Sequence, residues 1–543
     1  MTPLRITFEN LSYSVPVKNN KKRRNPFRRR ARSNREAEGP QDVEEAESTG
    51  AQGAGGLIAL GASMAEPQEA PPDRVEIETE HANRHLILKN LSGIFREGRL
   101  TAIIGSSGAG KTTLLSLLAG DVIRGSRISG NVYLNDEEVS GNWKKMREVS
   151  AFVFQDDLLL STMTVREAIW QSLLLRTPAE MNKEQQKQRL EETLRIFRLQ
   201  QAKDTVVGNP DKKGISGGER KRTAIAMDVC IRPSVLFLDE PTSGLDTYTA
   251  FTVVKILKNL TTLGHTIVMT IHQPSSEIFG LCDDLMVMAR GEILYLGEAQ
   301  ASVPYFSGLG YPCPQCSNPA DYFFMSVIQG VDMASEEENQ QGGEVAEVKL
   351  QRLLQAWRQS PQNASITALC NQRPNITISG YLHRAPFLRQ FWYLLGRASR
   401  NAIRNPLVIR VRIFQTVFVA VFIGLSFINL NRLSPTEQIQ NKFGVIFFMA
   451  LNQFFSSATG VMTIFAVEKF VFFREYRAGY YGLPAYYLSK VLVELPYQIV
   501  FPALFVLIIY YMVGLNPPFS RYLLAACLVI LAGICGAVKK CPF

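Results

Sequence analysis

The pattern of hydrophobic residues changes near residue 400, and this change restricts the possible folds more than any other feature of the chain. From residue 86 to residue 306, short β-rich runs alternate with helical patterns, which is typical of an α/β sheet domain. After it come four long apolar runs, at residues 413–430, 443–467, 495–515 and 522–538. Each run approaches the roughly 20 residues that a helix needs to cross the hydrocarbon of a bilayer. The sequence therefore predicts an α/β domain followed by an all-α transmembrane domain.

The length of 543 residues also requires more than one hydrophobic core. Charge and hydrophobicity suggest four consecutive parts: an α/β domain over 1–330, a polar linker over 331–380, an amphipathic connecting helix over 381–412, and a partial transmembrane domain with four spans over 413–543. In the first part, residues 4–17 alternate like an edge strand. Leu190, Leu194 and Phe197 share one helical face, which predicts a helical subdomain within the α/β domain.

Residues 18–73 have a composition unlike the rest of the first domain. They are basic, then acidic, then rich in Gly, Ala and Pro, and ten Lys and Arg residues lie between residues 18 and 35. Such a segment cannot bury enough apolar surface to offset its ordering entropy, so we expect a disordered insertion. A basic run can bind anionic lipid headgroups or nucleic acid, although more often it is a solvated loop. We expect contact with membrane lipid and no nucleic-acid partner.

The loops between the apolar runs differ in charge. Basic residues gather before the first run, between the second and third, and after the fourth: Arg404, Arg410, Arg412, Lys469, Arg474, Arg477, Lys490, Lys539 and Lys540. Because basic loops stay on the cytosolic side, both chain ends and the α/β domain are expected in the cytosol. Residues 387–404 combine apolar residues with arginines, which predicts a helix on the membrane surface or one packed on the soluble domain.

A glycine-rich segment follows the apolar run that ends at Ile104 and precedes a predicted helix. It consists of Gly105, Ser106, Ser107, Gly108, Ala109, Gly110, Lys111, Thr112 and Thr113. The glycines let backbone N–H groups approach phosphates closely, at a helix N-terminus that favours negative charge. Lys111 would reach the β- and γ-phosphates, and the Thr112 hydroxyl would coordinate Mg²⁺. The segment predicts a site for ATP with Mg²⁺.

Two further apolar runs end in polar residues suited to phosphate chemistry. Residues 235–238 form a short apolar run typical of a buried parallel strand, and it delivers Asp239 and Glu240 to the strand's carboxyl end. Asp239 would hold Mg²⁺ through water, and Glu240 would act as the general base toward the attacking water. His272 follows the run at 266–270 and can contact the γ-phosphate, although a lone histidine is more often structural.

Several segments resemble the ATP-binding cassette (ABC) family. The signature sequence of that family resembles Ser216, Gly217, Gly218 and Glu219, and its dimer-contact loop resembles Ser243, Gly244, Leu245 and Asp246. Gln155 is similar to the family's Mg²⁺-contacting glutamine. Glu219, the segment at 271–277 and the order of the two domains resemble the white-type (ABCG) subfamily of half-transporters.

This resemblance implies that two cassettes face each other, with each ATP between the glycine-rich loop of one and Ser216, Gly217 and Gly218 of the other. A chain with one set of motifs would pair as a homodimer, or as a heterodimer with another half-transporter. It would hydrolyse ATP and export a lipid, sterol or other amphipathic small molecule across the plasma membrane or an intracellular vesicle membrane. The adenine stacks on an aromatic residue in that family, and Tyr13 is the candidate here.

Members of that subfamily have six spans, whereas this sequence has four apolar runs, so we expect a chain truncated after the fourth span. Three hypotheses remain open. The chain is an exporting half-transporter, a transport-inactive ATP-binding subunit that regulates a full-length partner, or a cassette ATPase on a membrane anchor without a transported substrate.

Overall fold

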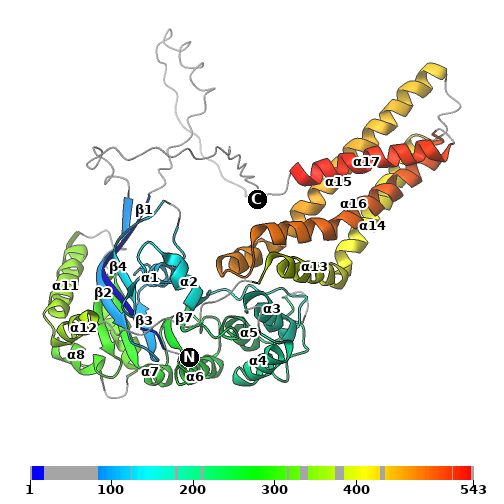
Figure 1. Cartoon of the computed structure of the whole chain (residues 1–543). Coiled ribbons are helices and arrows are strands. Elements are labelled where there is room, and N and C mark those ends of the chain that lie inside the picture. The colour runs from blue at the N-terminus through cyan, green and yellow to red at the C-terminus, as the bar shows by residue number, and fades with distance from the viewer. Residues whose placement is uncertain are drawn as a thin grey trace, which may run out of the picture.

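The computed structural model describes residues 3–16, 84–123, 125–177, 181–209, 213–314, 317–329, 340–372, 385–428, 434–515 and 518–539. An α/β domain is followed by a bundle of long helices, and Figure 1 shows α13 of the bundle lying over α3 of the α/β domain. The predicted fold class, an α/β domain followed by an all-α domain, is confirmed. The insertion expected at 18–73 lies outside the described residues.

A six-stranded sheet forms the centre of the α/β domain. Its strand order is β10-β9-β3-β8-β7-β6, and all neighbouring strands are parallel except β10 and β9. The strands are β3 (Leu100–Gly105), β6 (Ser150–Val153), β7 (Val235–Leu238), β8 (Thr266–Thr270), β9 (Asp284–Ala289) and β10 (Glu292–Glu298). Every residue of β3, β7, β8 and β9 is buried, because both faces of a parallel sheet are covered.

A second sheet is antiparallel, with the order β2-β1-β4-β5. Its strands are β1 (Ile6–Pro16), β2 (Arg84–Phe95), β4 (Arg127–Leu134) and β5 (Glu137–Glu138). The prediction of an edge strand at 4–17 is wrong in its position, because β1 pairs with β2 on one side and β4 on the other. Alternation of buried and exposed residues shows that one face of an antiparallel strand is buried. Edge strands and inner strands share this pattern, so the alternation does not tell them apart.

Helices surround these sheets and form the expected helical subdomain. Around the sheets lie α1 (Lys111–Leu118), α2 (Trp143–Val149), α6 (Thr247–Thr261), α7 (Ser276–Leu281), α8 (Ser302–Gly308), α9 (Pro319–Tyr322) and the π-helix η3 (Phe323–Gln329). The subdomain contains α3 (Val165–Arg176), α4 (Lys183–Ile196) and α5 (Gly217–Val229), which pack on one another. Leu190, Leu194 and Phe197 are all buried there, as their spacing predicts.

The region expected to be a polar linker contains two helices. These are α11 (Gln340–Arg358) and α12 (Pro361–Asn371), and they pack against β10 and β2. Leu350, Leu353, Leu354 and Trp357 of α11 are buried. Residues 340–371 therefore pack on the α/β domain through an apolar helix face. The helical pattern was not recognised in the sequence because a charged segment precedes it.

The C-terminal helices are α13 (Phe387–Arg404), α14 (Pro406–Ser426), α15 (Pro435–Arg477), α16 (Leu483–Val513) and α17 (Phe519–Lys539). The connecting helix is shorter than the 381–412 expected, because Asn405 is non-helical and Pro406 begins α14. A helix of 43 residues such as α15 is about 65 Å long, roughly twice the thickness of bilayer hydrocarbon. The C-terminal end of α15 contacts the α/β domain, where Arg474 donates to the carbonyl oxygen of Leu158.

Within the described residues, the segments Ile409–Ser426 and Leu483–Val513 are long and apolar enough to cross a membrane, and Phe519–Cys535 is a shorter apolar helix. Phe414, Phe418 and Phe422 lie four residues apart along α14 and are 60–69% exposed. An apolar stripe of this kind requires lipid or protein to cover it.

Candidate functional site

The glycine-rich loop connects β3 to α1 in the geometry that its sequence predicts. Gly108 and Gly110 have φ values of 83° and 93°, in the left-handed region that favours glycine. A Cβ atom at Gly105 would lie 2.4 Å from the carbonyl oxygen of Met288, so only glycine fits there. The buried Lys111 ammonium donates to the carbonyl oxygens of Gly105 and Ser106, both at 2.7 Å. The loop therefore curls around the lysine side chain at the start of α1.

Three parallel strands bring their carboxyl ends together beside this loop. The Thr112 hydroxyl donates to Oδ1 of Asp239 at 3.0 Å, and the Thr270 hydroxyl donates to the same oxygen at 2.7 Å. Thr270 also accepts a hydrogen bond of 2.9 Å from the backbone N–H of Glu240. No pattern in the sequence indicated that Thr270 bonds to both acidic residues, although Thr270 ends the apolar run that precedes His272. Thr270 orients both acidic residues by bonding to each.

Gln155 joins this acidic group from the segment after β6. Its Nε2 donates to Oε2 of Glu240 at 2.8 Å. The buried Lys221 ammonium donates to the backbone oxygen of Gln155 at 2.7 Å and forms an ion pair of 2.9 Å with Asp157. Burial raises the pKa of Asp157, and the nearby Lys221 partly offsets that rise. Lys221, which directly follows the signature-like residues in the basic run 220–222, thus holds the segment 155–162, here called the glutamine segment, in place.

The residue types in this group suit the chemistry of a metal-bound triphosphate. Thr112 and Asp239 offer a hydroxyl and a carboxylate within 3.0 Å of each other, and Gln155 adds an amide oxygen nearby. Hard oxygen donors of this kind fit Mg²⁺, which binds through one or two protein groups plus phosphate oxygens. His272 lies two residues beyond Thr270, on an exposed segment directly after β8.

The remaining predicted residues lie at the N-terminal ends of α5 and α6. Ser216 caps α5 and exchanges hydrogen bonds with Glu219, and Asp246 caps α6 by accepting from the N–H of Thr249 at 3.0 Å. Gly217 is exposed and has no atom within 4 Å of its ideal Cβ position, whereas a Cβ at Gly218 would lie 2.3 Å from Thr249. Within the described residues, the hydrogen bonds that Ser216 and Glu219 make are local to α5. One chain therefore assembles the glycine-rich loop together with Asp239 and Glu240, and it leaves Ser216 and Gly217 at the start of α5 exposed.

Tyr13 does not have the position that adenine stacking requires. It is only 3% exposed within β1, and its hydroxyl accepts a hydrogen bond of 3.3 Å from the backbone N–H of Ile123. A ring enclosed in a sheet core has no free face for a ligand, so this expectation is wrong.

The glutamine segment also contacts the C-terminal helices. The carbonyl oxygen of Leu158 accepts a hydrogen bond of 2.6 Å from Arg474 at the end of α15. The hydroxyl of Thr162 donates to Oδ1 of Asn401 in α13 at 2.6 Å. Thr162, whose hydroxyl bonds α13, thus lies only seven positions after Gln155, whose amide bonds Glu240. A displacement of this segment would be transmitted to both helices.

A buried ion pair stabilises the same junction. Nη1 of Arg397 in α13 donates to both carboxylate oxygens of Glu475 in α15, at 2.8 and 2.7 Å. Glu475 also accepts from the Tyr481 hydroxyl at 2.6 Å and from Gln171 of α3 at 3.2 Å. Burial lowers the pKa of Arg397, but Glu475 more than reverses this effect, so its pKa lies above the usual value. Through these bonds the pair links α3, α13 and α15.

A second buried pair lies beside it. Arg176 at the end of α3 pairs with Asp228 of α5 at 2.7 Å, and its guanidinium lies 4.5 Å from the ring centroid of Tyr480. The Tyr480 hydroxyl donates to the same Asp228 oxygen at 3.2 Å. Burial, together with Asp228, raises the pKa of Tyr480 to about 12. Tyr480 lies in the turn between α15 and α16, so this turn is anchored in the α/β domain.

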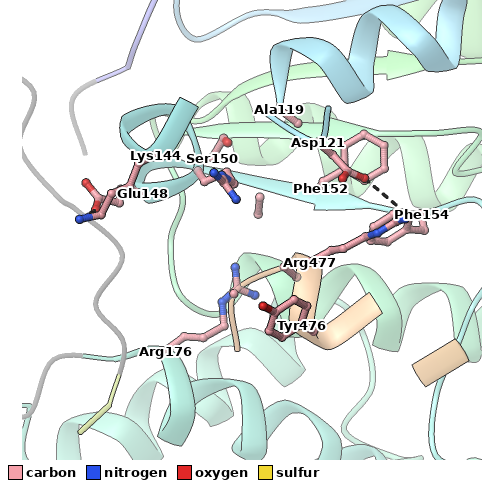
Figure 2. Close-up of a pocket in the computed structure, with 15 residues that line it drawn as sticks. Ala119, Asp121, Lys144, Glu148, Ser150, Phe152, Phe154, Arg176, Tyr476 and Arg477 are labelled. Carbon is pink, nitrogen blue, oxygen red and sulfur yellow. Dashed lines mark ion pairs between the residues drawn. The ribbon is translucent and has the colours of Figure 1, made fainter. Parts of the chain in front are cut away.

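A cavity of about 700 Å³ lies between the α/β domain and that turn. Figure 2 shows Phe152, Phe154 and Asp121 on one side and Tyr476 and Arg477 on the other. Arg477 bridges the two sides by an ion pair of 3.5 Å with Asp121. The turn therefore fills only part of its groove in the α/β domain.

Comparisons with known proteins agree with this architecture. Residues 88–243 match the family model described as ABC transporter, and residues 272–372 and 389–538 match two models described as ABC-2 type transporter. The chain is similar to protein white of Ceratitis capitata, with 36% identity over 461 residues. It is also similar to the broad substrate specificity ATP-binding cassette transporter ABCG2 of Bos taurus, at 34% over 454 residues, and to the ABC transporter ATP-binding protein/permease wht-1 of Caenorhabditis elegans, at 35% over 453 residues.

These similarities extend over most of the chain and about two thirds of each relative. They cover 83%, 80% and 82% of this chain in the same order, and 66%, 68% and 67% of the relatives. Both the α/β domain and the helical part are therefore included in the similarity.

Proposed function

This chain belongs to the ABCG family of ATP-binding cassette half-transporters, a family of multi-pass membrane proteins, and from that premise we propose that it hydrolyses ATP as a dimer and exports an amphipathic small molecule. One observation carries this proposal. The segment from Gln155 to Thr162 bonds to Glu240 at one end and to α13 at the other, with Arg474 contacting it in between. A group that senses the nucleotide is thereby connected to the membrane helices through a few bonds.

The residues of the site would divide the work of hydrolysis among them. The backbone N–H groups of residues 105–113 and the Lys111 ammonium would bind the phosphates. Mg²⁺, held by Thr112, Gln155 and, through water, Asp239, would neutralise charge on the phosphate oxygens. Glu240 would accept the proton of the attacking water, and Thr270 supports this role because it fixes the backbone at Glu240. His272 would contact the γ-phosphate from the end of β8.

Dimerisation would supply the second half of each site. Ser216 caps α5 and Gly217 and Gly218 begin it, and the backbone at Gly217 can approach a phosphate closely because, among the described residues, no neighbouring group lies within 4 Å of its ideal Cβ position. The loop of Ser243, Gly244, Leu245 and Asp246 would contact the facing cassette. The N-terminus of α5 adds a favourable field for an anion. The partner is a second copy or another half-transporter.

The orientation in the membrane and the kind of cargo are part of the same proposal. We infer that the α/β domain and both chain ends are cytosolic, in the plasma membrane or an intracellular vesicle membrane, since the basic loops lie on that side. Lipids, sterols and other amphiphiles fit apolar helices that carry a few amides, such as the buried Gln453 of α15.

The decisive experiment compares the wild type with Glu240→Gln in proteoliposomes, alone and together with an ABCG relative. We expect the wild type to show vanadate-sensitive ATPase activity and ATP-dependent movement of a fluorescent lipid. Glu240→Gln should bind ATP with unchanged affinity and lose at least about 100-fold in turnover, the usual scale for general base catalysis. Hydrolysis that persists in Glu240→Gln would contradict the base assignment. ATP binding without any hydrolysis by the wild type, alone or in the mixture, would refute the proposed function.

A further inference from the structure

A second cavity, of about 300 Å³, lies where the helical bundle meets the α/β domain at the start of α14. Its walls come from α13, α14, α15, α16 and the segment 159–162. The lining carries four charged side chains, Arg412, Glu468, Lys490 and Glu494, and its other polar residues are Ser161, Thr162, Asn401, Asn405 and Tyr497. From this lining we propose that the cavity binds the headgroup of a zwitterionic phospholipid from the cytosolic leaflet, as a fixed ligand distinct from the exported molecule.

The charges in this cavity balance one another. Arg412 pairs with Glu494 at 3.1 Å, and Lys490 pairs with Glu468. The four side chains are each between 11% and 25% exposed, so they are shielded from bulk water and yet reach the cavity. Two cations and two anions therefore face one small space.

A zwitterionic headgroup brings one positive and one negative charge, so it can bind beside the two ion pairs without leaving a charge uncompensated. Its phosphodiester can approach the Arg412 guanidinium and the Lys490 ammonium, and its amine can approach the carboxylates of Glu468 and Glu494. The Tyr497 ring, which Arg412 already contacts at 5.7 Å, offers a face to a choline or ethanolamine cation. A headgroup with a net negative charge would add one unpaired charge to a partly buried site, which is unfavourable.

The depth of the cavity suits a lipid rather than a soluble ligand. Arg412 lies at the start of the apolar segment Ile409–Ser426, at the level where arginine and tyrosine side chains meet the headgroups. Exposed apolar side chains continue from this level on both helices: Ile413 and Phe414 on α14, and Leu495 and Ile499 on α16. Acyl chains attached to a headgroup in the cavity would cover these side chains.

The cavity also shares a wall with the glutamine segment. Thr162 bonds to Asn401, and Asn401 donates to Oε1 of Glu468 at 2.6 Å. Leu159 and Leu160 line the cavity directly. A bound headgroup would therefore stabilise the contact through which the ATPase site and the membrane helices are connected.

The test uses the purified full-length chain in nanodiscs that contain equal amounts of phosphatidylethanolamine and phosphatidylglycerol. After transfer to detergent, retained lipid is counted by native mass spectrometry. We expect retained phosphatidylethanolamine to exceed phosphatidylglycerol about tenfold. Equal retention of the two lipids would overturn the proposal. Excess glycerophosphoethanolamine, the same headgroup without acyl chains, should not displace the lipid, and displacement would overturn the membrane source.

Two variants locate the site. Ala402→Phe fills the cavity without changing a charge and should abolish the retention, whereas Ile403→Phe, at a neighbouring residue of α13 that is 72% exposed, should not. Glu494→Gln makes the lining net positive and should shift the preference toward phosphatidylglycerol. An unchanged lipid preference in Glu494→Gln would refute the charge argument even if Ala402→Phe failed to fold. Lipid counting needs no transport activity, so a failure here is distinguishable from a failure of the proposed function.

Discussion

Removal of the charge of Glu475 is the sharpest test of how the two domains are held together. Glu475 and Arg397 are 2% and 6% exposed, and the carboxylate accepts two hydrogen bonds from Arg397, one from Tyr481 and one from Gln171. Glu475→Gln keeps the size of the side chain, and it turns one acceptor into a donor that faces the Arg397 cation. The variant therefore leaves a buried guanidinium without a counter-charge.

The cost of this change follows from the burial of both partners. Breaking a buried ion pair by removal of one partner costs about 3–5 kcal/mol, because the remaining charge stays desolvated. This loss corresponds to about 150- to 5,000-fold in the equilibrium for opening the buried junction of α3, α13 and α15. The double variant Arg397→Met with Glu475→Leu removes both charges and should recover most of the loss.

Hydrogen exchange is the appropriate assay, since a protein of several domains need not unfold in one step. Amides near Gln171 and Tyr481 should lose protection in Glu475→Gln and regain it in the double variant, and vanadate-sensitive ATPase activity should follow the same order. Glu437→Gln is the matched control, because this carboxylate lies at the exposed N-terminus of the same helix α15. Unchanged protection in Glu475→Gln, or no recovery in the double variant, would refute the reasoning.

Three further predictions concern the site and its surroundings. Lys111→Ala should weaken ATP binding about 10- to 100-fold, the scale of a charge-assisted hydrogen bond, and equal retention on ATP resin would contradict this. Gly217→Leu should leave the thermal midpoint of unfolding unchanged, because the added Cβ meets open space. The same variant should lose nucleotide-dependent dimerisation, measured by crosslinking. A variant that still dimerises would show that Gly217 lies outside the interface. The Arg404 hydrogen bond lowers the pKa of Glu167, so their contact stabilises the fold at neutral pH and is lost as the pH falls through that lowered pKa. Exchange protection at the start of α3 should fall at acidic pH in the wild type and fall less in Arg404→Gln, in which Glu167 keeps its capping bond to Thr164 but loses the arginine. An equal fall in both proteins would contradict the role of Arg404.

Local features of this protein could be predicted from its sequence because neighbours in the chain determine them. The glycine-rich loop needs glycine at 108 and 110 for its positive φ angles, and Ser216 with Glu219 forms a helix cap within four residues. The buried strand before Asp239 was recognisable from its apolar run. These patterns were sufficient to predict the fold class and the local geometry of the glycine-rich loop.

Contacts between distant segments were decided by the tertiary structure alone. Arg397 and Glu475 are 78 residues apart, and nothing in either segment identifies the other as its partner. Tyr13 had an aromatic ring in a suitable stretch of sequence, but packing between β2 and β4 placed that ring in the core. A polar or aromatic side chain can serve many partners, and which one it meets depends on how whole helices and sheets pack. Short stretches of sequence thus determine the residues of the candidate site. How these residues connect to the membrane helices depends on the packing of distant segments.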